Sequence, residues 1–275
     1  MFTIVNKIGL APGIKQFTIN APDIAKKAQP GEFVILRANE NSARIHLNIV
    51  DFDRNEGTIT LVLEEDGNST IHLDSLEPGD KILDLAGPLG NGSDIAKFGK
   101  VICIASGVQI ASVYPITRAL KEIGNEVVSI IGADTKEHII FHQEMKEVSD
   151  EIHIFTEDGS EGQKGLARDL LKQTLEKDAK FDLVMAIGSI AMMRDVCEIT
   201  RSYNIPTRVN MHVPILDGVG LCGTCRVSVG GKIKFACVDG PEFDGHLVDW
   251  DIAEQRMNAF KAEEHISGGG CKCQK

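Results

Sequence analysis

Three closely spaced cysteines carry the strongest chemical signal in the sequence. The run DGVGLCGTCRVSVGGKIKFAC contains Cys222, Cys225 and Cys237, with two residues between the first pair and eleven between Cys225 and Cys237. A CxxC pair on a tight loop brings two thiolates within reach of one metal centre, and the glycines around it allow the backbone to fold compactly. The segment is therefore a candidate metal or cluster site.

The residues after the CxxC pair predict where the third thiolate lies. RVSV and KIKFA alternate in period two on either side of Gly230-Gly231, which is typical of a β-hairpin with a two-residue turn. If residue 229 pairs with residue 232, residue 224 lies opposite residue 237. Cys237 then returns beside Cys225, so the spacing and the strand geometry indicate one site.

Three thiolates need a fourth ligand. Asp217 is separated from Cys222 by four residues, which matches the plant-type [2Fe–2S] spacing CxxxxCxxC with Asp in place of the first Cys. A carboxylate also supplies one negative ligand. The main alternative is zinc bound by the three cysteines and by His212 or His246, because zinc accepts such a set at looser spacing. Three buried structural cysteines without a metal would be a third interpretation.

The elements that must position this site fall into two regions. Residues 1–99 contain six short period-two runs separated by APG, QPGE, NEG and EPGD, which predicts a small antiparallel barrel. From residue 100, short strands alternate with helical stretches, which predicts an open, mainly parallel sheet covered by helices on both faces. The expected strands are 101–105, 126–131, 151–155, 181–187 and 207–211. We expect domains at 1–99, 100–211 and 212–275, with a last helix over about 252–264.

Small or polar residues recur where the predicted parallel strands end. Ligands of such sheets bind beyond the carboxyl ends of the strands, so these positions are candidate binding residues. They can also be turn residues only. The positions are Ser106-Gly107, Gly132 to Asp134, Thr156 to Ser160 and Gly188-Ser189.

Composition limits the possible functions. The 275 residues include 29 Lys and Arg against 40 Asp and Glu, a formal charge of −11, which is the wrong sign for a nucleic-acid binder. No signal peptide or membrane span is expected, so the predicted location is the cytoplasm. Seven cysteines without a signal peptide indicate reduced thiols and metal ligands, and Cys103 and Cys197 are expected to be buried small hydrophobes.

Beyond these patterns, the run from Asp217 to Asp251 closely resembles the cluster segment of a known family. The family is that of the small (alpha) subunits of NADH-dependent ferredoxin:NADP oxidoreductases, which are flavin-based electron-bifurcating transhydrogenases. Its ferredoxin-reductase-like relatives include the electron-transfer subunit of dihydroorotate dehydrogenase and the small subunit of sulfide dehydrogenase. The resemblance covers essentially the whole chain. It implies a [2Fe–2S] cluster, and Asp217 favours the transhydrogenase branch because the dihydroorotate dehydrogenase subunit has Cys there.

The resemblance also implies a barrel that binds FAD. The first flavin motif corresponds to Arg44, His46, Leu47 and Asn48, where His46 replaces the usual Pro and Asn48 the usual Ser or Thr. Asn can still hydrogen-bond a flavin ring atom, and Arg44 can neutralise a pyrophosphate or be only a surface cation. The sequence GPLG at 87–90 is expected to close the barrel and to mark the crevice between the domains. The second flavin motif, 65–70, resembles an ordinary turn by itself and contributes Gly67, Ser69 and Thr70.

The second domain resembles an NAD(H)-binding module with a reduced glycine motif. Where the family has GGVGIAP, this chain has SGVQIAS over 106–112, so the middle glycine, Gly107, remains. Glycines at this turn let a dinucleotide approach the helix N-terminus. The resemblance implies NAD(H) at Gly107, Thr156, Asp158 and Gly188. The alternative is a module that lost the nucleotide and relays electrons from other redox centres, or the electron-transfer subunit of a dihydroorotate or sulfide dehydrogenase.

Chemistry of this kind resides in the cofactors. The resemblance implies hydride transfer between nicotinamide C4 and FAD N5, with single electrons passing to the cluster, so no catalytic acid, base or nucleophile is expected. It also implies a large partner flavoprotein subunit with FAD and [4Fe–4S] clusters, related to the glutamate synthase small subunit. The tail with Cys271 and Cys273 is expected to be a solvated terminus or a metal or partner contact. Acidic residues near the cluster either orient a basic partner or only solvate the surface: Asp239, Glu242, Asp244, Asp249 and Asp251.

Overall fold

The N-terminal third of the chain forms a nearly closed antiparallel barrel in the computed structural model, which describes residues 2–65, 68–177 and 180–258. Its sheet has the order β6-β1-β2-β5-β4-β3-β7, and the two edge strands are joined in the chain by Leu83 alone. Buried Ile, Leu, Val and Phe side chains fill its interior. The elements are β1 (Phe2–Ala11), β2 (Ile14–Asn20), α1 (Pro22–Ala25), β3 (Phe33–Arg37), β4 (Ile45–Asp53), β5 (Thr58–Glu64), α2 (Asn68–Asp74), β6 (Lys81–Ile82) and β7 (Asp84–Leu89).

A second sheet of order β11-β10-β9-β8-β12-β13-β16 follows. All its pairings are parallel except that of β13 with β16. Alternate residues of β8 face opposite sides, with Cys103 toward α3 and α4, and Ile102 and Ile104 toward α5 and α6. The elements are β8 (Lys100–Ser106), α3 (Gln109–Glu122), β9 (Glu126–Ala133), η1 (Lys136–His138), α4 (His142–Glu147), β10 (Glu151–Thr156), β11 (Gln163–Lys164), α5 (Ala167–Lys177), β12 (Leu183–Ile187), α6 (Ile190–Ser202) and β13 (Thr207–Asn210).

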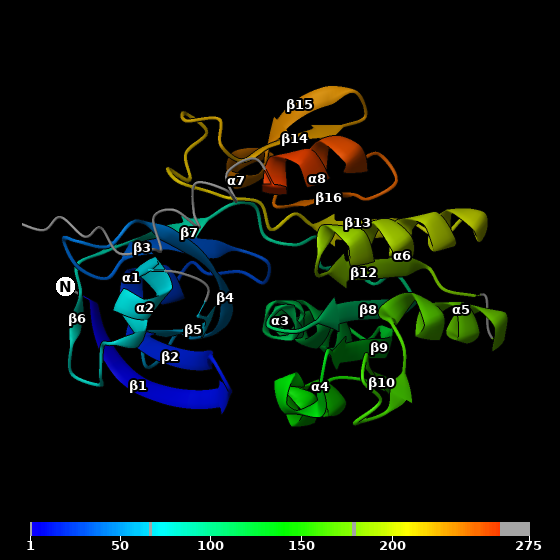
Figure 1. Ribbon diagram of the computed structural model, residues 1–275, viewed down its shortest axis with the longest axis horizontal. Coiled ribbons are helices and arrows are strands. Elements are labelled where there is room, and N and C mark those ends of the chain that lie inside the picture. Colours follow the sequence, from blue (N-terminus) through cyan, green and yellow to red (C-terminus); the bar gives the residue numbers. More distant parts are fainter. Residues whose placement is uncertain (1, 66–67, 178–179, 259–275) are drawn as a thin grey trace, which may run out of the picture.

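The cysteine segment lies across the place where the two sheets meet (Figure 1). It contains the hairpin β14 (Arg226–Val229) and β15 (Lys232–Phe235), then α7 (Ala236–Asp239), β16 (Glu242–Asp244) and α8 (Trp250–Asn258). Strand β16 extends the parallel sheet, and α8 packs against α6 and β14. One hydrophobic core contains residues of this segment, of the sheet and of barrel strand β3.

Helix α3 joins the barrel to the parallel sheet. Its buried side chains share one core with barrel residues Val50 and Val62. Two polar contacts cross the same joint: Asn48 Nδ2 donates to Ser112 Oγ at 2.8 Å, and Arg118 pairs with Asp51 at 2.7 Å. The middle of strand β4 is therefore held against α3.

The predicted fold class is confirmed: an antiparallel barrel, a parallel α/β sheet and a C-terminal cysteine segment. Each of the five expected parallel strands is present, and Cys103 and Cys197 are buried as expected. Helix α2 begins inside the stretch that by itself resembled an ordinary turn, and the last helix starts two residues before the expected position, at Trp250. Among the described residues, no helix is long and apolar enough to cross a membrane.

A buried amide holds the connection between the two sheets. Asn125, which is 3% exposed, accepts hydrogen bonds from the backbone N–H groups of Phe98 and Gly99 and donates to the carbonyls of Ala96 and Leu120. Because Asn125→Ala leaves four backbone groups without this partner, we expect it to lower the free energy of unfolding by about 2–4 kcal/mol. Urea unfolding measures the loss. Asn55→Ala, at an exposed turn, serves as the control, and equal midpoints for both variants would contradict the assignment.

Candidate functional site

The hairpin after the CxxC pair has the predicted register. Val229 pairs with Lys232 and Arg226 with Phe235 around Gly230 and Gly231, both of which adopt positive φ. The N–H of Ala236 donates to the carbonyl of Cys225 at 3.0 Å, which continues the ladder toward the cysteines. The Sγ atoms of Cys225 and Cys237 lie 3.2 Å apart, and both residues are 1% exposed. The expected return of Cys237 beside Cys225 is therefore confirmed.

Asp217 organises the loop that leads to these cysteines. Its carboxylate accepts backbone N–H groups of Val219 at 3.0 Å, Leu221 at 3.0 Å and Cys222 at 2.5 Å. These bonds, led by that of Val219, hold the pKa of Asp217 below its ordinary value. A carboxylate offers about four lone-pair sites, so three bonds leave room for a metal.

Cys222 differs from its neighbours because it is exposed. Hydrogen bonding to Thr224 lowers the pKa of Cys222, whereas burial, followed by the Cys225 thiol, raises the pKa of Cys237 to about 12. A metal would therefore have to displace the proton of Cys237, as thiolate ligation requires. Within the described ranges, no set of three or more His, Cys, Asp or Glu is already spaced to hold a metal ion. The loop would have to close around a bound group.

The histidines of the zinc interpretation make other contacts. The His212 ring lies 4.6 Å from that of His46, and His246 Nε2 lies 3.0 Å from Thr200 Oγ1. The donor set near the buried thiols is therefore two cysteines with Cys222 and Asp217 on the adjoining loop.

Nearby acidic residues have structural roles. Asp239 pairs with Lys234, Glu242 with Arg208 and Asp251 with Arg194. Asp244 and Asp249 accept the backbone N–H groups of His246 and Ile252. Each of these five residues therefore has a partner within the chain.

The residues of the first flavin motif lie on β4 or just before it. Arg44 is exposed and lines a hollow of about 390 Å³ together with Asp217, which connects the barrel surface to the cysteine loop. His46 Nε2 is buried and has no hydrogen-bond partner among the described residues, and Asn48 contacts Ser112 of α3. Leu47 is half-buried against the barrel core. A polar cofactor edge at this joint would give the orphaned nitrogen of His46 a partner.

The second flavin motif is only partly visible. Gly67 lies outside the described residues, Ser69 falls in the first turn of α2, and Thr70 follows it in the same helix. Lys15 Nζ contacts Glu65 at 3.0 Å and also pairs with Asp74 at the end of α2. The motif is therefore anchored to β2. Cys271 and Cys273 also lie outside the described residues.

The sequence GPLG lies against the cysteine segment. A Cβ on Gly90 would meet Phe33 and Pro241, and the N–H of Asn91 donates to the carbonyl of Gly240 at 2.7 Å. The stretch forms the end of the barrel's edge strand β7, and it contacts residues that follow the third cysteine.

A cavity of about 670 Å³ opens at the carboxyl ends of β8, β9, β10 and β12. Gly107 and Gly188 line it, as do Glu64 of the barrel and His212 just after β13. Gly107 adopts a φ of +60°, and a Cβ there would meet nothing within 4 Å, so the turn is open to a ligand. Because barrel and sheet both contribute residues, the cavity lies between the two units.

The other two residues that were predicted to bind the nucleotide form hydrogen bonds within the loop after β10. Thr156 Oγ1 donates to the carbonyl of Glu161 at 2.7 Å, and Asp158 Oδ1 accepts from both the backbone N–H and the hydroxyl of Ser160. Neither residue lines the cavity in this structure. The sequence suggested His212 only as a possible zinc ligand and missed its place in the cavity, although its position directly after a parallel strand is the signal that could have found it.

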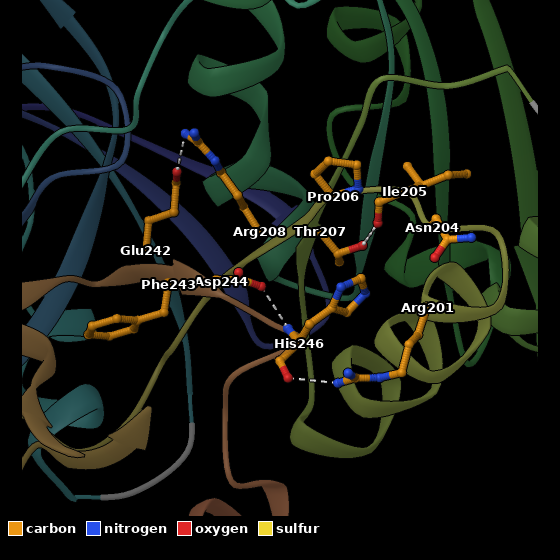
Figure 2. A pocket seen from close by; sticks show the side chains of 10 residues that line it. All are labelled: Arg201, Asn204, Ile205, Pro206, Thr207, Arg208, Glu242, Phe243, Asp244 and His246. Atoms are coloured by element: carbon orange, nitrogen blue, oxygen red, sulfur yellow. Dashed lines mark hydrogen bonds and ion pairs between the residues drawn. The ribbon is translucent and has the colours of Figure 1, made fainter. Parts of the chain in front are cut away.

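A second hollow, of about 760 Å³, lies at the start of β13 and is lined by α6, β13 and β16 (Figure 2). Its polar groups engage one another: Arg201 donates to the carbonyl of His246, Asp244 accepts from the N–H of His246, and Arg208 pairs with Glu242. It lies at the amino end of β13, opposite the ligand-binding edge of the sheet, so we place no site there.

Comparison with known proteins identifies relatives of the chain. Residues 214–249 match the family described as the iron-sulfur cluster binding domain of dihydroorotate dehydrogenase B. The dihydroorotate dehydrogenase B (NAD(+)) electron transfer subunit homolog of Thermotoga maritima is 42% identical over 264 residues, which cover 96% of this chain and 93% of the relative.

Solved structures extend the comparison. The structure of an NADH-dependent reduced ferredoxin-NADP oxidoreductase, studied for flavin-based electron bifurcation, has a TM-score of 0.92 and 41% identity over 97% of this chain and 96% of that chain. The ferredoxin reductase of carbazole 1,9a-dioxygenase, at 15% identity and a TM-score of 0.65, covers 74% of this chain and 65% of its own. This second likeness shows a ferredoxin-reductase-like fold only.

The contact between His46 and His212 predicts sensitivity to acid. Burial lowers the pKa of His212 to about 4, and burial followed by the charge of His212 lowers that of His46. Because the unfolded imidazole titrates near 6.5, the unfolded chain binds more protons below that pH. Stability contributed by neutral His212 is therefore lost as the pH falls from about 6.5 to 4, by on the order of 2 kcal/mol.

Urea unfolding at pH 7.5, 6 and 5 tests this expectation. The variant His212→Gln should lose less stability over this interval than the wild type, since carboxylates titrate equally in both proteins. Equal pH profiles would show that His212 is not held neutral by the fold.

Proposed function

Because this chain belongs to the family of dihydroorotate dehydrogenase B electron-transfer subunits and their homologues, we propose that it carries FAD and a [2Fe–2S] cluster and moves electrons between NAD(H) and a partner subunit. Family membership itself makes the chain an oxidoreductase electron-transfer subunit with an iron–sulfur binding domain. The observation that carries the proposal is the contact between Cys225 and Cys237 inside the matched segment, on a loop organised by Asp217.

In this proposal, Asp217, Cys222, Cys225 and Cys237 hold the cluster. Two thiols are already adjacent, and the exposed Cys222 lies on the loop that Asp217 ties together. The carboxylate keeps the loop compact through its backbone hydrogen bonds and offers its remaining lone pair. Iron is favoured over zinc because the spacing is of the [2Fe–2S] type and His212 and His246 contact other groups.

The proposed FAD lies at the joint between β4 and α3. Asn48 would hydrogen-bond the flavin ring, His46 would offer its unpartnered Nε2, and Arg44 would meet the pyrophosphate. Leu47 would pack beside the ring, and Gly67, Ser69 and Thr70 would meet phosphate. The hollow shared by Arg44 and Asp217 supports a short path from this cofactor to the cluster.

The proposed NAD(H) site is the cavity lined by Gly107 and Gly188, with Thr156 and Asp158 shaping the adjoining loop. When bound, FAD and nicotinamide supply hydride chemistry and the cluster accepts single electrons. The protein orients the cofactors across the joint between barrel and sheet, and no side-chain acid or base is needed. We assign residues 1–99 to the FAD barrel, 100–211 to the nucleotide domain and 212–275 to the cluster segment.

An electron-relay subunit without NAD(H) is the second candidate. Gln109 occupies the first turn of α3 where the family has glycine, so this turn carries a side chain at a position where a full glycine motif has none. A dihydroorotate or sulfide dehydrogenase subunit would share the same cofactors. Asp217 in place of Cys favours the transhydrogenase type.

We further propose a partner of the kind that the resemblance implies: a large flavoprotein subunit with FAD and [4Fe–4S] clusters, similar to the glutamate synthase small subunit. A chain with a single cluster needs an onward electron acceptor. The expected assembly is a heterodimer or larger complex in the cytoplasm. Size-exclusion chromatography of native extract, probed with antibody, should place the chain well above 30 kDa, and elution as a monomer would contradict the partner.

An anaerobic titration tests the function. Iron, zinc and extracted flavin are counted first, and the visible spectrum is then followed as NADH is added. Two irons, one FAD and bleaching by NADH support the proposal. Bleaching by dithionite but not by NADH supports the relay, and zinc without iron or flavin rejects both.

Removal of a buried thiol should abolish the cluster. We expect Cys237→Ala to lose both irons and the visible absorption of the cluster while it retains FAD, because Cys225 would lose its neighbouring ligand. Iron analysis and visible spectroscopy of the purified chain measure this. Cys197→Ala, a matched change of a buried cysteine on α6, should keep both irons, and iron loss in both variants would point to unfolding rather than ligation.

A further inference from the structure

Carboxylates dominate the charge of the cavity at the carboxyl ends of the parallel strands. Four acidic residues line it, whereas Arg168 is the one Lys or Arg among the described lining residues. Arg168 itself forms ion pairs with Asp195 at 3.1 Å and with Asp169 at 4.0 Å. The acidic lining residues are Glu64, Asp134, Glu157 and Asp195.

Two of these carboxylates follow neighbouring strands. Asp134 comes directly after β9 and Glu157 directly after β10, and these strands pair in parallel up to Thr156 and Ala133. The backbone ladder continues past the strands, since the N–H of Glu157 donates to the carbonyl of Ala133, and that of Asp158 to Asp134, both at 3.1 Å. The two side chains therefore start from adjacent, fixed backbone positions.

Asp134 is oriented by its own surroundings. Its Oδ1 accepts the N–H of Thr135 at 2.9 Å and lies 2.9 Å from His138 Nδ1. Its other oxygen can accept a further hydrogen bond. Glu157 is exposed at the cavity wall, and no hydrogen bond or ion pair engages its side chain within the described ranges.

An independent feature of the cavity points to a polar ligand. Gln109, at the start of the fourteen-residue helix α3, has a buried Oε1 without a hydrogen-bond partner among the described residues. Among the residues that the structure describes, no side chain caps this helix, and its N-terminus lies at the cavity that Gly107 also lines. Phosphate oxygens bind at such helix N-termini, and a donor on the ligand would satisfy Gln109.

In chain order, β8 is the first strand of the parallel sheet and β9 is the second, and the two lie side by side. Helix α3 begins after β8, and Asp134 follows β9. In this arrangement an acidic side chain accepts a hydrogen bond from the ribose 2′-hydroxyl, whereas a 2′-phosphate needs a cation. A phosphate adds close to two negative charges, which the nearby carboxylates would repel.

We propose that Asp134 and Glu157 are specificity-determining residues that accept the ribose 2′-hydroxyl of NAD(H) and exclude the 2′-phosphate of NADP(H). The inference rests on the nucleotide site of the proposed function and names the groups that select its ligand. Asp134 and Glu157 select and position the nucleotide without touching the reacting atoms.

Calorimetric binding of ADP-ribose and 2′-phospho-ADP-ribose tests the selection without turnover, because neither ligand carries nicotinamide. The measurements use the full chain with its cofactors at pH 8, where free imidazole is neutral. We expect the wild type to bind ADP-ribose at least about tenfold more tightly. In the double variant Asp134→Asn, Glu157→Gln, this ratio should fall to within about threefold, since both repelling charges are gone.

Glu151→Gln is the matched control, because Glu151 lies on the same β10 but at its amino end, away from the cavity. It removes one charge and should leave the ratio unchanged. Equal wild-type affinity for the two ligands, or an unchanged ratio in the double variant, overturns the inference while the nucleotide site stands. If neither ligand binds the wild type, the NAD(H) site of the proposed function fails and this inference fails with it.

Discussion

The packing of β4 against α3 is the contact on which the rest of the molecule depends. Apolar side chains of both units share one core there, and two polar contacts, Asn48 with Ser112 and Asp51 with Arg118, fix the register of the barrel relative to the parallel sheet. Electron and hydride transfer require cofactors at short, constant separation. A joint made of buried apolar contacts and directional hydrogen bonds keeps that separation constant, because sliding of the barrel against the parallel sheet would break both kinds of contact at once.

The cysteine segment depends on the same joint, because it is anchored to both sides of it. A Cβ on Gly218 would meet Ile35 and Leu89 of the barrel, which shows how closely the loop of Asp217 lies on β3 and β7. At its other end, β16 adds to the parallel sheet and α8 packs on α6. A loop rich in glycine cannot hold a site by its own core, so its geometry is taken from the two sheets that it spans.

The common direction of the parallel strands decides where the proposed nucleotide site lies. All the carboxyl ends of β8, β9, β10 and β12 open on one edge, where the helix N-terminus of α3 favours phosphate and the carboxylates after β9 and β10 oppose further negative charge. His212 lies at this edge, and its ring contacts that of His46 in the barrel. Burial keeps the imidazole of His212 neutral. The two proposed sites are thus connected through β4, α3 and the residues after β13.

Local sequence determined the elements and part of the cluster site. Period-two runs, helical spacing and the Gly230-Gly231 turn suffice for the strands, the fold class and the return of Cys237 beside Cys225, because these depend on contacts within a few residues or on one hairpin register. Tertiary structure alone decided the contacts of His212 with His46 and of Asn48 with Ser112, the cavity shared by Glu64 and Gly107, and the pairing of Glu242 in the cysteine segment with Arg208 of the parallel sheet. Such contacts join residues that are 60 or more positions apart or lie on different units, as with the 64 positions between Asn48 and Ser112, so they follow from how the sheets pack and not from any local pattern.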